Sequence, residues 1–139
     1  MGRAGRELAR WMLRAGFASE EEFRRCVYIC SIIRCFPGRT ADNRGDRRPP
    51  PKAIANCRPW MDAELELLRP RVIIAVGQLA IERFLGRGPL EERVGRVFGT
   101  APYVLPLPHP SGQSRWLNDH ANRARLEQAL RLLSELRTA

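Results

Sequence analysis

The sequence contains almost no lysine and no long apolar run, and both absences narrow the class of protein. Lys52 is the single lysine among 24 basic residues. Because arginine binds phosphate through a fixed fork of donors, this bias fits a phosphate-binding surface, but it fits the base composition of a gene equally well. No stretch approaches the roughly 20 apolar residues of a membrane span. The amphipathic N-terminus also lacks the apolar core of a signal peptide, so we expect a cytoplasmic protein.

A glycine-rich phosphate loop is absent after every apolar run, which disfavours a nucleotide-binding α/β protein. The four cysteines are Cys26, Cys30, Cys35 and Cys57. Since they lie in a chain without a secretory signal, we expect free thiols or metal ligands rather than disulfides. The formal net charge of +9 indicates a polyanionic partner, with nucleic acid as the leading candidate.

The length of the chain is that of one domain. The chain has 139 residues. A domain of this size buries about 68–70% of the surface that its unfolded chain exposes, so it needs no disulfide or metal to fold. We therefore expect a single domain over residues 1–139.

Apolar periodicity predicts helices in five parts of the chain. They are an amphipathic helix over 8–15 stopped by Gly16, a short acidic helix with a capping box of Ser19 and Glu22, and helices over 52–68, 78–86 and 126–136. Pro59 is expected to open a second segment of the 52–68 helix, and Arg69 before Pro70 is expected to end it. Between these helices, residues 37–51 are predicted to form a loop rich in Gly, Arg, Asp and Pro.

Three apolar, β-branched runs predict buried strands. They cover residues 27–36, residues 71–77, and the end of segment 96–108, where a short strand and a turn come first. Because strands and helices alternate, we expect a three-layer α/β/α fold with right-handed crossovers and a short, mostly parallel sheet. Ligands of such sheets bind beyond the carboxyl ends of the strands. Those ends are residues 31–37, Gly77 with Gln78, and the loop 109–116, so His109 is either a turn residue or part of a site.

Three segments carry a resemblance to a known family: "YICSIIRCFPG", "CRPWMDAELELLRPRVIIAVGQLAIERFLG" and "LPLPHPSGQSRW". Together, and in this order, they resemble the uracil-DNA glycosylase superfamily, above all its bacterial and archaeal iron–sulfur branches. The resemblance implies hydrolysis of the N-glycosidic bond of uracil, or of a related deaminated base, in DNA. It also implies that the base leaves the stack, because the bond cannot be reached inside the duplex.

The resemblance assigns roles to the loop that follows the last strand. His109 would donate to the uracil oxygen on which negative charge builds as the bond breaks. The rest of the loop would contact DNA: Pro110, Ser111 and Gly112 against the phosphates, then Gln113, Ser114 and Arg115 in the groove. Either Arg115 or Trp116 would fill the gap left by the base, and Trp116 has the alternative role of packing the loop onto the last helix.

Ser31 lies where many members of the family have an asparagine that reads the edge of uracil. A hydroxyl both donates and accepts, so Ser31 either recognises the base, with hypoxanthine or another deaminated base as an altered substrate, or packs beneath the pocket. The resemblance also makes Cys35 and Cys57 two ligands of a 4Fe-4S cluster. The other two ligands normally lie in an upstream Cys-x-x-Cys pair, so Cys26 and Cys30 are interpreted as small strand residues. His120 is interpreted as a residue on the surface of a helix.

The family's first motif is not found in this sequence. That motif supplies a first strand, a glycine-rich loop and a side chain that positions water. We therefore expect a gene start placed too late, and a chain that is poorly stable, lacks a complete cluster and releases no uracil by itself. The alternative is a non-catalytic relative that binds nucleic acid. In either case the expected partner is DNA. We expect the protein to be a monomer and to have no membrane partner.

Overall fold

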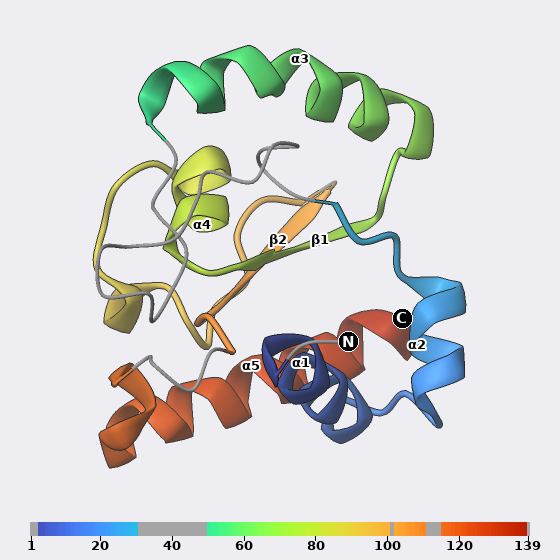
Figure 1. Ribbon diagram of the computed structural model, residues 1–139. Helices are drawn as coiled ribbons and strands as arrows, with labels where there is room; N and C mark the ends of the chain where they lie inside the picture. The colour runs from blue at the N-terminus through green and yellow to red at the C-terminus, as the bar shows by residue number, and fades with distance from the viewer. Residues whose placement is uncertain (1–2, 31–49, 101, 111–114, 139) are drawn as a thin grey trace. The chain divides into compact units, whose positions relative to one another are not determined.

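Two parallel strands form the sheet of the described structure. The computed structural model describes residues 3–30, 50–100, 102–110 and 115–138. Strands β1 (Val72–Val76) and β2 (Tyr103–Leu107) pair in parallel, as Figure 1 shows. The strands expected within 71–77 and at the end of 96–108 are thereby confirmed, as are the α/β class and the parallel pairing.

Five α-helices and two short 3-10 helices accompany this sheet in the described residues. They are α1 (Arg3–Arg14), α2 (Glu20–Cys26), α3 (Pro51–Leu68), α4 (Gln78–Leu85), η1 (Leu90–Glu92), η2 (Trp116–Asn118) and α5 (His120–Thr138). None of these helices combines the length and the apolar character needed to cross a membrane. The chain divides into two compact units, one of Met1–Tyr28 with Pro70–Ala139 and one of Ile29–Arg69.

Helices of the larger unit cover both faces of the sheet. Along β1, Val72, Ile74 and Val76 pack against a core that also contains side chains of α1, α2 and α5. The alternate residues, Ile73 and Ala75, belong to a second cluster with side chains of α4. This alternation follows from the pleat, which points successive side chains to opposite faces. Both faces are apolar, as the continuous apolar runs predicted.

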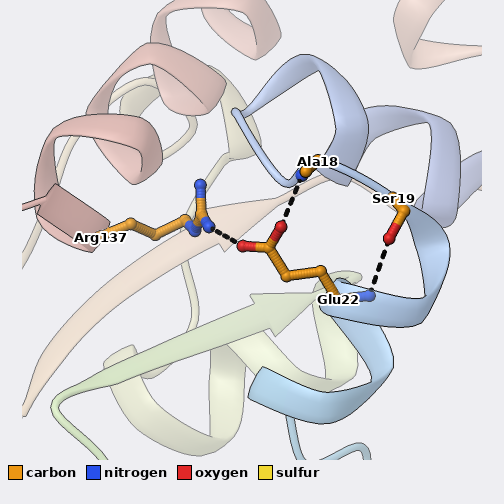
Figure 2. A network of polar contacts seen from close by, with 4 residues as sticks. All are labelled: Ala18, Ser19, Glu22 and Arg137. Carbon is orange, nitrogen blue, oxygen red and sulfur yellow. Dashed lines mark hydrogen bonds and ion pairs between the residues drawn. The ribbon is translucent and has the colours of Figure 1, made fainter.

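The corner between α1 and α2 is fixed by Ser19 and Glu22. The Ser19 hydroxyl oxygen accepts a hydrogen bond of 3.1 Å from the backbone N–H of Glu22, and a Glu22 carboxylate oxygen accepts one of 2.9 Å from the N–H of Ala18 (Figure 2). The predicted capping box is therefore present, with the carboxylate reaching the residue before the cap. Gly16 ends the preceding turn at a φ of 104°, a conformation that favours glycine.

The end of α5 is joined to this corner by Arg137. Its guanidinium donates a 2.8 Å hydrogen bond to the second carboxylate oxygen of Glu22 (Figure 2) and lies 3.7 Å from the centroid of the Phe17 ring. The apolar residues on the same face of α5, Leu126, Ala129, Leu130 and Leu133, are buried. The last helix is thus held both by its apolar face and by one charged contact.

Proline 59 does not open a second helical segment, because α3 runs from Pro51 to Leu68 with Pro59 inside it. An interior proline removes one backbone hydrogen bond and crowds the carbonyl of the residue four positions earlier, yet α3 continues on both sides of Pro59. The end of α3 agrees with the prediction, since Arg69 is its C-cap. Pro50 and Pro51 stand at its start, and the preceding residues 37–49 of the predicted loop lie outside the described residues.

The predicted strand over 27–36 is wrong for its first four residues. Residues 27–30 form no helix or strand, and 31–36 lie outside the described residues. Cys26 is the last residue of α2, and both Cys26 and Cys30 are exposed, so neither is a strand residue. Acidic residues in the first turn of α2 and arginines in its last turn favour the helix up to Cys26. Neither of the two described strands pairs with residues 27–30, which follow Cys26.

We expect Arg137→Met to lower the free energy of unfolding by about 1–2 kcal/mol, because it removes a charged hydrogen bond and a cation–π contact that are only partly exposed to water. Chemical denaturation measures this change. The control is Arg24→Met, which removes an exposed pair with Glu20 and should cost about 0.5 kcal/mol or less. Equal losses in the two variants would contradict the role given to Arg137.

Candidate functional site

The carboxyl ends of β1 and β2 lie side by side. Val76 is the partner of Leu107 in the register, and the N–H of Gly77 donates a 2.9 Å hydrogen bond to the carbonyl of Leu107. The residues that follow each strand therefore leave the sheet at the same edge. Two of the three strand ends named from the sequence are brought together in this way, those at Gly77 and at His109.

His109 stands between two buried prolines at this edge. Pro108 and Pro110 are buried whereas His109 is exposed. Proline fixes its own φ and restricts the residue before it to extended conformations, so the backbone on both sides of the histidine is stiff. The prolines on either side of His109 thus direct its polar side chain away from the apolar end of the strand.

The ring of His109 lies directly over Gly77. A Cβ atom built on Gly77 would be 3.2 Å from the Cδ2 atom of His109 and 3.7 Å from its Cβ. Gly77 is also the N-cap of α4, where no side chain caps the helix. The imidazole therefore lies at the positive end of a helix dipole, and a ring N–H can donate to an oxygen that carries negative charge. This pairing of donor and dipole can stabilise an anion formed at the edge of the sheet.

Gln78 uses its side chain elsewhere. Its amide nitrogen lies 3.1 Å from the carbonyl oxygen of Gly88 and 3.3 Å from a carboxylate oxygen of Glu82, as the donor in both contacts. The bond to Gly88 ties the first residue of α4 to the segment that follows the helix. At Gly77, the nearest atoms to a Cβ built on the residue belong to His109.

Trp116 anchors the chain after the loop 111–114. Its indole N–H donates a 2.8 Å hydrogen bond to Glu91, its carbonyl accepts one of 2.9 Å from the amide of Asn122, and its ring packs against the larger apolar core. These contacts agree with the packing interpretation of Trp116. The preceding residue, Arg115, is exposed and is the N-cap of η2, so its position is set by the anchor beside it.

Glu91 and Asn122 were not predicted from the sequence. Asn122 is buried and Glu91 is exposed, and neither belongs to a motif, because the partner of Glu91 lies 25 residues along the chain. A polar residue on the apolar face of the last helix is the one signal that could have indicated Asn122. His120, by contrast, is an exposed residue of α5 that contacts Arg123, as predicted.

Several predicted site residues lie outside the described residues. They are Ser31, Cys35, Ser111, Gly112, Gln113 and Ser114. Cys57 is a half-buried residue of α3. Among the residues that the structure describes, no group of three or more His, Cys, Asp or Glu side chains could hold a metal ion. The described donors therefore do not make a cluster site, and the ligand roles of Cys35 and Cys57 remain predictions.

The pKa of Glu91 lies below its ordinary value. A backbone hydrogen bond within the residue is the largest cause, and the hydrogen bond from the Trp116 indole is the next. Both bonds favour the charged carboxylate. Since the pKa is lower in the folded state, this contribution to stability is present above the unfolded-state pKa and is lost as the pH falls through the folded-state pKa.

Trp116→Phe should raise the pKa of Glu91 toward its ordinary value, because the ring is kept while the N–H donor is removed. Titration of the Glu91 carboxylate by NMR measures the shift. Trp60→Phe makes the same chemical change at an exposed position of α3 and should leave the pKa of Glu91 where it is. An unchanged pKa in Trp116→Phe would show that the indole does not hold this carboxylate in solution.

Comparison with known proteins gives the same family over almost the whole chain. Residues 1–134 match the family model described as the Uracil DNA glycosylase superfamily. A Type-5 uracil-DNA glycosylase of Pyrobaculum aerophilum is 35% identical over 91 residues, which are 63% of this chain and 37% of that protein. A Type-4 uracil-DNA glycosylase of Thermotoga maritima is 29% identical over 133 residues, which are 91% of this chain and 62% of that protein.

A third relative is more distant. It is a Type-4 uracil-DNA glycosylase of Archaeoglobus fulgidus, 28% identical over 121 residues, which are 80% of this chain and 55% of that protein. In all three comparisons the matched part is less than two thirds of the relative's own length.

Proposed function

This chain belongs to the uracil-DNA glycosylase superfamily, and on that premise we propose that the whole protein removes uracil from DNA as the first step of base excision repair. The proposal concerns the whole protein because the chain spans 37–62% of the length of its three relatives. The observation that carries it is the exposed His109 over Gly77, at the shared carboxyl edge of the two strands.

The reaction breaks the bond between C1′ of deoxyribose and N1 of uracil, and forms a bond from C1′ to the oxygen of water. The bonding electrons move into the uracil ring, where an oxygen takes the negative charge, and the departing base finally takes a proton while water loses one. His109 donates a hydrogen bond to that oxygen. One well-placed donor of this kind accelerates a reaction by roughly 100- to 1,000-fold.

The DNA strand is held by charge and by the loop after His109. Pro110 itself is buried, so we propose that the residues after it contact DNA: Ser111 and Gly112 against the phosphates beside the extruded nucleotide, and Gln113, Ser114 and Arg115 along the groove. Short polar side chains and backbone N–H groups allow close approach to phosphate. The net charge of +9 adds attraction that does not depend on sequence. Arg115 is an exposed cation at the end of this loop, and it is the natural phosphate ligand there.

Two finer assignments belong to the same proposal. Ser31 contacts the edge of the base, so the substrate is uracil or a related deaminated base. Cys35 and Cys57 would supply two of the four thiolates that hold a 4Fe-4S cluster. No catalytic step is assigned to the cluster, and His109 acts without it.

His109→Ala should slow base release by two or more orders of magnitude, because the charge on the departing base loses its donor, while DNA binding is unchanged. Single-turnover release of uracil from a labelled strand measures the rate. The control is His120→Ala, which removes the second of the two histidines, an exposed residue of α5. Both proteins are compared as the whole protein. Equal rates for His109→Ala and the unaltered whole protein would refute the role of His109. DNA binding without uracil release by the unaltered whole protein would favour a non-catalytic relative.

Arg115→Ala should weaken DNA binding and lower the salt slope of the binding constant by about one, the change expected when one phosphate contact is lost. Titrations at several salt concentrations measure the slope. Arg10→Ala is the control, because the Arg10 guanidinium already pairs with Glu7 on α1. A slope that does not respond to Arg115→Ala would remove this residue from the DNA interface.

A further inference from the structure

We infer that Gly77 is a positioning residue that sets the place of the His109 ring, an inference that rests on the proposed function for its kinetic consequence. The two residues follow neighbouring strands, and the hydrogen bond from Gly77 to the carbonyl of Leu107 locks their backbones together. A Cβ on Gly77 would come within 3.2 Å of the ring carbon Cδ2. The absence of a side chain at 77 therefore leaves the space that the imidazole occupies.

The contact is closer than a side chain permits without movement. The ring would have to shift by a few tenths of an ångström or rotate about its side-chain bonds, because the three heavy atoms nearest to the added carbon all belong to His109. His109 is exposed, so its ring can move outward. A residue larger than glycine at 77 would thus displace the donor rather than break the core, and a displacement near 1 Å can cost about 100-fold in rate.

Backbone conformation offers a competing explanation for the glycine. Gly77 has φ 87° and ψ 161°, in a region that is essentially restricted to glycine. Alanine would be strained there whatever the position of His109. A test must therefore separate the strain of the backbone from the displacement of the ring.

Gly86 at the other end of α4 provides that separation. Its φ of 78° and ψ of −175° lie in the same glycine-restricted region, but nothing lies within 4 Å of a Cβ built on it. Gly86→Ala therefore imposes a comparable backbone strain without a collision. Gly77→Ala imposes the strain together with the collision against His109.

The first measurement needs no enzymatic activity. The chain has two histidines, so a histidine-labelled protein gives two sets of ring signals in NMR. Gly77→Ala should shift the ring signals of His109 and leave those of His120, which lies on α5 beside Arg123. Gly86→Ala should shift neither, while its melting temperature falls by an amount similar to that of Gly77→Ala. Unmoved His109 signals in Gly77→Ala would overturn the inference.

The second measurement is the single-turnover rate of uracil release. Gly77→Ala should slow release by up to about 10-fold, less than the loss for a displacement of about 1 Å, with DNA binding unchanged, and Gly86→Ala should not. In the His109→Ala background, Gly77→Ala should have no further effect, because its action passes through the ring. A full additional loss in that background would overturn the inference. If the whole protein releases no uracil but the His109 signals move as expected, the proposed function fails and the positioning of the ring stands.

A folding defect in Gly77→Ala does not prevent the test. Removal of the ring in the Gly77→Ala, His109→Ala double variant takes away the atoms that the new methyl group meets. The double variant should then be more stable than Gly77→Ala alone, and denaturation measures the difference. No gain in stability from the removal of the ring would contradict the collision on which the inference depends.

Discussion

The parallel pairing of β1 with β2 is the constraint on which the site depends. Because Val76 faces Leu107 in this register, Gly77 and His109 emerge at one edge of the sheet and come into contact. A slip of the register by one residue would turn every side chain of a strand to the opposite face. Both faces are packed, by α4 on one side and by α1, α2 and α5 on the other, so the cores themselves hold the site in register.

The last helix, α5, makes polar contacts at both of its ends. At its start, Asn122 holds the carbonyl of Trp116, and Trp116 in turn reaches Glu91, so the chain from Trp116 onward is fixed on the core. At its end, Arg137 holds Glu22 and covers the ring of Phe17. Such contacts suit a site on a loop, because precise chemistry requires that the residues on both sides of the loop are held in place.

Periodicity and caps allowed most of the fold to be predicted. Continuous apolar, β-branched runs indicated β1 and β2, and the pair Ser19 and Glu22 indicated the start of α2, because these signals are local. The strand expected from residue 27 was wrong over 27–30, since apolar character alone cannot supply a pairing partner. The candidate site was predicted in part: His109 and Gly77 follow from strand ends, whereas the link between Glu91 and Trp116 depends on tertiary distance that no local pattern encodes.

The contact between the His109 ring and Gly77 is tested most directly by nuclear Overhauser measurement in solution. A Cβ atom built on Gly77 would lie 3.2 Å from the Cδ2 atom of His109. In glycine, an α hydrogen points toward that position. A strong cross-peak between that α hydrogen and the Hδ2 proton of His109 is the expected result. Its absence, with His109 giving cross-peaks only to residues adjacent in sequence, would contradict the arrangement of the site.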